Sequence, residues 1–257
     1  MLNYLVEITI FIFGICIGSF LNVCILRLPA GQSIVHPPSS CPRCGSAIRF
    51  YDNIPVLSYF LLRGKCRTCK TPIAFRYVLV ELLGGCMAVC TYLRFGPTVT
   101  GGIYYLFIAA LLVITFIDLD HRIIPDVISL PGIPAGVAAS FMIPSLNTVD
   151  ALIGILAGGG ILYLVAWSYD RFTGKEGMGG GDIKLLAMIG AFIGWHGVLL
   201  TIFAASAIGT LVGILAMLKS RKTMKMAIPF GPFLSLGAII YLFFGNELIF
   251  WYLHTLG

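Results

Sequence analysis

Charged residues are scarce in this chain of 257 residues. Asp, Glu, Lys and Arg together make up 11% of the sequence, whereas hydrophobic residues make up 58% and the mean hydropathy is +0.96. Soluble domains carry about 25% charged residues. The scarcity of charge therefore excludes an ordinary soluble domain and predicts an all-α polytopic membrane protein.

Motifs of several enzyme classes are also missing. No His-Glu-x-x-His motif is present, which argues against a zinc-dependent membrane protease of that type. The glycine-rich residues 177–181 are not followed by the Lys-Ser or Lys-Thr of a phosphate-binding loop. The sequence contains no methyl-donor fingerprint. None of the four histidines is paired with another: His36, His121, His196 and His254.

Long apolar runs are the most abundant feature. A helix crosses a bilayer with roughly 17 to 25 residues. One of the predicted spans, the sixth at residues 182–194, holds only thirteen residues. The turn Gly194-Trp-His-Gly197 that ends it is inferred mainly from the length of the 182–218 stretch. Reading that stretch as one tilted helix gives seven spans and moves the C-terminus to the other side. We predict eight spans, at residues 5–27, 77–94, 102–119, 125–143, 149–169, 182–194, 197–218 and 230–252.

Lys and Arg are distributed unevenly between the predicted loops. Positively charged loops stay in the cytoplasm. With the N-terminus outside, sixteen of the seventeen basic residues lie on the cytoplasmic side or at its boundary, and Arg94 is the exception. The net charge of +6 therefore reflects topology and attraction to anionic lipid. It predicts membrane lipid, and no nucleic acid, as a partner.

The polar segment 28–76 contains two Cys-x-x-Cys knuckles. Cys41 and Cys44 are separated by 21 residues from Cys66 and Cys69. Four thiolates at about this spacing converge tetrahedrally on zinc, so we predict a structural Zn²⁺ site without an open coordination position. Two disulfides or a redox pair are alternatives, but the predicted location is reducing and no thioredoxin-like pattern surrounds the cysteines. Zinc would supply folding energy to a loop too short for a large core.

Asp118 and Asp182 lie at the predicted cytoplasmic ends of two apolar segments. Carboxylates are costly at membrane depth and are retained mainly for function, so two at matching depths predict one shared site. Two aspartates that hold one proton in common can activate water. For Asp182, and for Asp126 beside Pro125, capping of a helix N-terminus is the simpler interpretation when each residue is taken alone.

Three glycines, Gly179, Gly180 and Gly181, directly precede Asp182. Their missing side chains allow a substrate backbone to approach closely. We therefore predict that they bind substrate, together with Lys184. Glu81 lies near an apolar segment, and both a structural pairing and a functional role stay open for it. Ordinary solvation explains the carboxylates in loops or near helix ends, which are Asp52, Asp150, Asp170, Glu176 and Glu247.

Short motifs extend over nearly the whole chain. In or beside the apolar segments they are Gly179-x-Gly-Asp182-x-Lys184, Asp118 seven residues before Pro125, Gly18-Ser-Phe-Leu-Asn22-Val and Pro229-Phe-Gly-Pro232. In the polar loop they are His36-Pro-Pro-Ser-Ser-Cys41, Asn53-Ile-Pro-Val-Leu-Ser-Tyr59 and Arg63-Gly-Lys-Cys66. By these motifs the chain resembles the type IV prepilin peptidases, which are integral-membrane aspartic proteases. The loop motifs resemble those of the long bacterial branch.

The resemblance implies that Asp118 and Asp182 are the catalytic pair of an aspartic endopeptidase. Such an enzyme removes the basic leader from prepilins of type IV pili, or from pseudopilins of protein secretion, at the cytoplasmic face. It also implies N-methylation of the new N-terminus with S-adenosylmethionine. The expected location is the cell inner membrane, with the N-terminus outside. We expect a first transmembrane helix at 1–27, a cytoplasmic zinc domain at 28–76 and a protease helix bundle at 77–257.

Two other classes of protein stay open. A transporter would also bury paired carboxylates as a cation site, but it would show inverted repeats, and no convincing repeat is found. A non-enzymatic membrane scaffold would use the cysteine loop to dock a partner, and both aspartates would then be dispensable. Incubation of the solubilised protein with a prepilin separates the three, because only the peptidase removes the leader.

Overall fold

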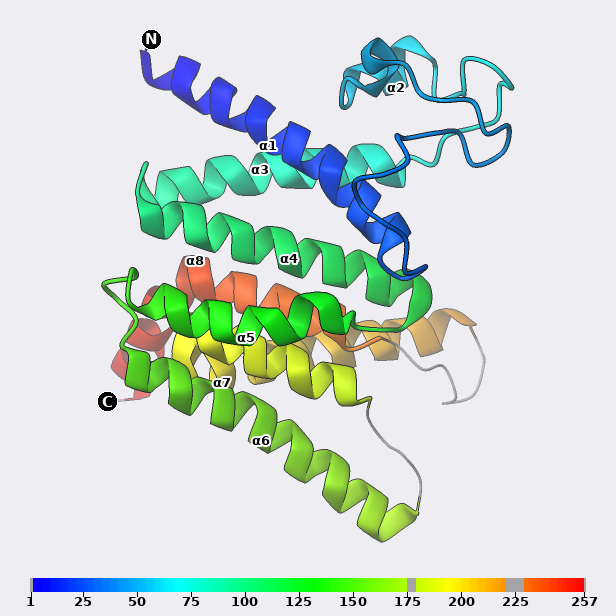
Figure 1. The fold of residues 1–257 in the computed structure, drawn as a ribbon. Coiled ribbons are helices and arrows are strands. Elements are labelled where there is room, and N and C mark those ends of the chain that lie inside the picture. The colour runs from blue at the N-terminus through cyan, green and yellow to red at the C-terminus, as the bar shows by residue number, and fades with distance from the viewer. Residues whose placement is uncertain (1, 175–178, 221–228, 257) are drawn as a thin grey trace. The chain divides into compact units, whose positions relative to one another are not determined.

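A computed structural model describes residues 2–174, 179–220 and 229–256 of the chain (Figure 1). Within those residues the fold is all-helical, as predicted, and the only β features are isolated bridges between Ser40 and Ala47 and between Lys65 and Pro72. The helices are α1 (Leu2–Arg27), a 3-10 turn η1 (Phe50–Asn53), α2 (Leu57–Leu61), α3 (Arg76–Phe95), α4 (Val99–His121), α5 (Asp126–Ser140), α6 (Thr148–Thr173), α7 (Gly180–Ser220) and α8 (Gly231–Leu256).

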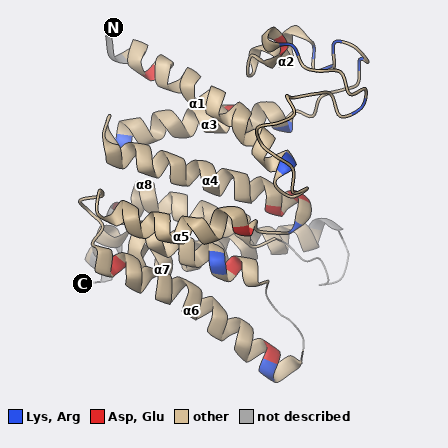
Figure 2. Cartoon of the chain, viewed as in Figure 1, with Lys and Arg blue, Asp and Glu red and all other residues tan. Residues whose placement is uncertain are grey.

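Five helices among the described residues are long and apolar enough to cross a membrane, namely α1, α3, α4, α6 and α7. The prediction of a multi-pass membrane protein therefore agrees with the structure, but the count of eight spans is not confirmed. α5 has only 15 residues, which is short for a membrane-spanning helix, whereas α8 has 26. Figure 2 shows that most charged residues of the helices lie toward helix ends.

Helix α7 reverses direction at Gly194. This residue has φ 70° and ψ 178°, a conformation that glycine adopts without strain. In an unbroken helix Gly190 and Val198 would lie about 12 Å apart along the axis. A Cβ atom added to Gly190 would nevertheless stand 3.0 Å from Cγ2 of Val198. The two limbs of α7 therefore fold back on each other, which a single tilted helix over 182–218 does not allow.

The chain forms two compact units, Met1–Val113 and Ile114–Gly257. In the first unit, α1 and α3 pack against each other through glycines. A Cβ on Gly14 would stand 2.7 Å from the carbonyl oxygen of Gly84, and a Cβ on Gly18 would stand 2.7 Å from Cα of Glu81. Small residues of this kind allow the backbones of membrane helices to approach closely.

In the second unit, α5, α6 and α8 all pack against α7. The contact of α6 with α7 again depends on glycine. A Cβ on Gly154 would stand 2.3 Å from the carbonyl oxygen of Gly190, and a Cβ on Gly158 would stand 2.4 Å from that of Leu186. Gly160, two residues further along α6, has no such neighbour within 4 Å. The position of the glycine on the helix therefore decides whether a side chain is tolerated.

We expect Gly154→Val to destabilise the second unit by at least the roughly 1–3 kcal/mol that is typical of overpacking. The atoms in the way belong to backbone and cannot rotate aside. Gly160→Val introduces the same side chain on the same helix into open space, so it should leave the unfolding temperature nearly unchanged. Thermal unfolding in detergent compares the two variants, and equal losses would contradict this account of the α6–α7 contact.

Candidate active site

The two aspartates singled out in the sequence lie in one site of the second unit. Asp118 is near the end of α4 and is only 5% exposed. Asp182 is half-buried in the first turn of α7. Ile124 lies near both segments, because a Cβ on Gly181, next to Asp182, would stand 2.9 Å from Cβ of Ile124, and a Cβ on Gly231 would stand 2.6 Å from Oδ2 of Asp118 and 3.4 Å from Cδ1 of Ile124. The segments that carry the two aspartates therefore converge on Ile124.

The start of α8 supplies a hydrogen bond to this site. The backbone N–H of Gly231 donates to Oδ2 of Asp118 at 3.0 Å. The first N–H groups of a helix lack partners within it and carry partial positive charge, so they stabilise a carboxylate. A Cβ at Gly231 would stand 2.6 Å from Oδ2 of Asp118, so glycine leaves room for this contact. The sequence indicates no role for Gly231, because a backbone donor leaves no side-chain signal.

Ile124, in the connection between α4 and α5, lies near both the start of α7 and the start of α8. A Cβ on Gly181 would stand 2.9 Å from Cβ of Ile124, and a Cβ on Gly231 would stand 3.4 Å from its Cδ1. Gly181 is therefore packed against this connection. Gly179 and Gly180 are exposed and have nothing within 4 Å of an added Cβ. The backbone beside Asp182 is thus open to a bound chain at these two glycines.

An ion pair ties α7 to α5 beside the site. Nζ of Lys184 donates to both carboxylate oxygens of Asp126 at 2.8 Å. Asp126 is the first residue of α5, Pro125 takes the N-cap position, and no side chain caps the helix, so the capping interpretation of Asp126 is wrong. Asp182 likewise lies inside the first turn of α7, which begins at Gly180, so it does not occupy the N-cap position of that helix. Substrate binding by Lys184 stays a prediction.

The four cysteines of the polar loop converge in the first unit. Their sulfur atoms all lie within 4.8 Å of one another, and Sγ of Cys41 and Sγ of Cys69 are 3.8 Å apart. A tetrahedral site with Zn–S bonds of about 2.3 Å has sulfur atoms about 3.8 Å apart. All four thiols are free of disulfide bonds. The donor set therefore fits zinc, whose ligands would be Cys41, Cys44, Cys66 and Cys69.

The two knuckles have the same backbone geometry. In the first, the N–H of Cys41 donates to the carbonyl of Ser46 at 2.9 Å, and in the second the N–H of Cys66 donates to that of Thr71 at 2.8 Å. The Thr71 hydroxyl also lies 3.2 Å from Sγ of Cys69 and lowers the pKa of that thiol to about 6. Thiolate is the form that binds metal, so this contact favours ligation.

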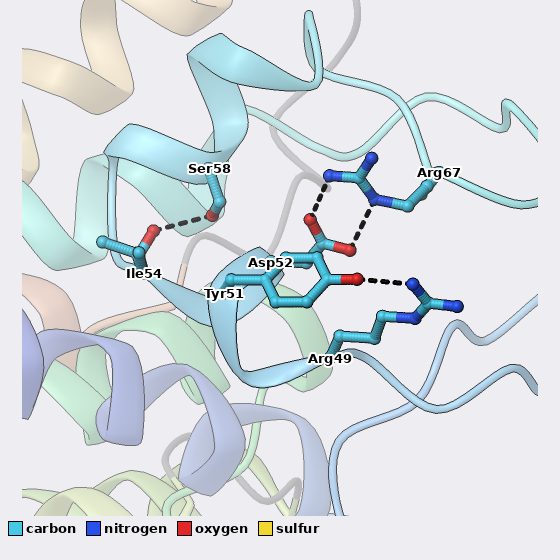
Figure 3. A network of polar contacts seen from close by, with 6 residues as sticks. All are labelled: Arg49, Tyr51, Asp52, Ile54, Ser58 and Arg67. Carbon is cyan, nitrogen blue, oxygen red and sulfur yellow. Dashed lines mark hydrogen bonds and ion pairs between the residues drawn. The ribbon is translucent and has the colours of Figure 1, made fainter.

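A polar network links the second knuckle to the turn η1 (Figure 3). Arg67 lies between Cys66 and Cys69 and donates from Nε and Nη2 to both oxygens of Asp52, at 2.8 and 2.6 Å. Its guanidinium also lies over the ring of Tyr51, 5.6 Å from the centroid. Hydrogen bonding from Arg67 lowers the pKa of Asp52. Asp52 is therefore a structural partner of the knuckle, and the prediction of ordinary solvation for it is wrong.

These observations define a class: a multi-pass helical membrane protein with a buried and a half-buried aspartate at converging helix ends and a tetracysteine loop. Two family profiles match the chain. The Bacterial Peptidase A24 N-terminal domain matches residues 12–95, and the Type IV leader peptidase family matches residues 105–214. The chain belongs to the type IV leader peptidase family. This membership confirms the resemblance seen in the motifs and argues against the transporter and scaffold alternatives.

Curated relatives match almost the full length. A "Prepilin leader peptidase/N-methyltransferase" of Pseudomonas aeruginosa is 38% identical over 267 residues, covering 95% of this chain and 92% of the relative. Proteins of the same name from Burkholderia pseudomallei and Myxococcus xanthus are 36% and 42% identical. They cover 91% and 85% of this chain, and 84% and 65% of the respective relatives. No solved structure matches the chain significantly.

Proposed function

We propose that this protein is a membrane aspartic endopeptidase that removes the basic leader from type IV prepilins or pseudopilins. The observation that carries the proposal is the convergence of the segments of Asp118 and Asp182 around Ile124 and Gly231, beside the open backbone of Gly179 and Gly180. The names of the relatives support the same substrate class. The new N-terminus would then be methylated, as those names also indicate.

The contact of Gly231 with Asp118 suggests how the two aspartates divide their work. Asp118 accepts the amide hydrogen bond, so it is the carboxylate that stays ionised and takes a proton from water. Asp182 holds the shared proton and donates it to the scissile carbonyl oxygen while water oxygen attacks the carbonyl carbon. When the tetrahedral intermediate collapses, the C–N bond breaks, the amine takes the proton from Asp118, and Asp182 recovers its own. No covalent intermediate forms.

Location makes this chemistry selective. We place the N-terminus outside and the loop 28–76 in the cytoplasm, because the basic residues gather there. A prepilin has a basic leader followed by an apolar helix, so insertion of that helix brings the junction to the inner interface. Gly179 and Gly180 would bind the extended junction through backbone hydrogen bonds, and Gly181 and Lys184 would keep this segment in place against Ile124 and Asp126.

Within this scheme residues 1–27 are the first membrane helix, residues 28–76 a zinc-braced cytoplasmic domain and residues 77–257 the protease bundle. Zinc on the four cysteines is structural, since four protein ligands leave no position for water. S-adenosylmethionine would supply the methyl group in the second reaction, and no step of leader cleavage involves it.

Mass spectrometry of a co-expressed pilin tests both activities. We expect the pilin N-terminus to lack its leader and to carry one added methyl group. Intact prepilin in the presence of well-folded enzyme would contradict the endopeptidase. A trimmed but unmethylated pilin would leave the protease and remove the methyltransferase. Cleavage in detergent without added metal, and in the presence of serine and thiol blockers, would separate the aspartate pair from other protease mechanisms.

A further inference from the structure

The short helix α2 leaves an apolar face uncovered. Leu57, Phe60 and Leu61 are spaced three and four residues apart, so they lie on one side of the helix. Their exposed fractions are 53%, 62% and 70%. In the preceding turn Phe50 is also exposed, at 87%, and Ile54 at 44%. Contiguous large apolar side chains on a surface usually mark an interaction site.

Contacts within the first unit hold α2 against the first turns of α3. The N–H of Val56, the N-cap residue of α2, donates to Oε2 of Glu81 at 2.7 Å. Glu81 is buried and lies five residues beyond the start of α3, or about 7.5 Å along that helix. The rings of Tyr59 and Phe75 also meet edge to face, 6.1 Å apart. The structural role of Glu81 is thus to bind the backbone of the loop against the span α3.

Basic residues surround this apolar face. The loop 28–76 has seven Lys or Arg residues and one acidic residue, Asp52, which pairs with Arg67. Arg49 directly precedes η1, and Arg63 follows α2 by two residues. Long basic side chains at the edges of an apolar patch can reach lipid headgroups while the patch enters the acyl region. The same charges would repel the basic leader of a prepilin, which argues against the substrate as occupant.

We propose that residues 50–61 form an in-plane anchor whose apolar face inserts among the lipids of the cytoplasmic leaflet, with the flanking basic residues on anionic headgroups. The inference depends on the loop being cytoplasmic, as proposed above. Its partner is a lipid surface, whose negative charge on the cytoplasmic side complements the excess of basic residues. The anchor would hold the tetracysteine domain against the membrane instead of leaving it free in solution.

Quenching by brominated lipid tests this anchor in the full-length protein. Phe60→Trp places an indole on the α2 face, and the emission it adds to that of native Trp167, Trp195 and Trp251 is measured by difference in lipid nanodiscs. Apolar faces of interfacial helices lie about 5–10 Å into the headgroup and acyl boundary. The added emission should therefore be largely lost with bromine on the upper acyl chain and less so with bromine near the bilayer centre.

Thr68→Trp is the matched control, because Thr68 is exposed in the same loop but belongs to the second knuckle. Its added emission should be the same in brominated and ordinary lipid. No quenching with Phe60→Trp, or equal quenching in both variants, would overturn the anchor. Leader removal is measured on the same preparations. If Phe60→Trp cleaves prepilin but its added emission is not quenched, the anchor alone is contradicted. If the added emission is quenched but neither this variant nor the wild-type protein cleaves prepilin, the proposed function alone is contradicted.

Discussion

Asp118→Asn and Asp182→Asn should each abolish leader removal. Asparagine keeps the size of the side chain but can neither take a proton from water nor hold the proton that the pair shares. A positioned acid or base contributes about 10²–10⁴-fold to a rate, so each variant should lose at least about 10²-fold. The rate is measured from the mobility shift of a purified prepilin in detergent.

Asp120→Asn provides the control for the same end of α4. Asp120 is exposed two residues beyond Asp118, and its amide variant should cleave at the wild-type rate. The double variant of Asp118 and Asp182 should lose little more activity than either single variant, since groups that act as a unit are not additive. Wild-type cleavage by either single variant, with an unchanged unfolding temperature, would remove the aspartate pair from the mechanism.

Replacing Cys41 with serine should release zinc and unfold the loop 28–76. We expect the wild-type protein to purify with one zinc ion per chain, because the four sulfur atoms already lie within 4.8 Å of one another and two of them are 3.8 Å apart. Binding of structural zinc contributes about 10–16 kcal/mol to the folding of small domains. Loss of one ligand should therefore appear as loss of metal by elemental analysis and as rapid proteolysis within the loop.

Cys86→Ser gives a matched control for the zinc experiment. Cys86 is an exposed, free thiol on α3 and lies outside the cysteine cluster. This variant should keep its zinc and resist protease like the wild type. A wild-type protein that binds no zinc, even when zinc is added under reducing conditions, would contradict the metal site. A redox role for the knuckles would instead appear as a disulfide that forms reversibly.

The sequence predicted the class of fold better than its details. Composition alone indicates membrane helices, because apolar residues dominate every long segment. The ends of helices were less predictable. Residues 125–143 were expected to span the bilayer, yet α5 ends at Ser140 after 15 residues. The turn expected at 194–197 occurs at Gly194 because this glycine adopts a positive φ, a local property that sequence can indicate.

The candidate sites differ in how far they could be predicted. Cysteine knuckles depend on spacing along a short segment, so the four ligands could be named from the sequence, and the structure brings their sulfur atoms together. The same spacing did not indicate the Asp52–Arg67 pair, which connects the turn η1 to the second knuckle. Surface charges of this kind have many possible partners, and only the folded loop selects one.

The sequence by itself determined that this protein is a helical membrane protein with two costly aspartates, because hydropathy and the rarity of buried charge are properties of composition and position. The sequence did not determine which residues surround those aspartates in the folded protein. The amide of Gly231, the packing of Ile124 on Gly181 and the ion pair of Lys184 with Asp126 all join segments far apart in the chain. Only the tertiary structure decided them, since a contact between distant helices leaves no periodic pattern in either one.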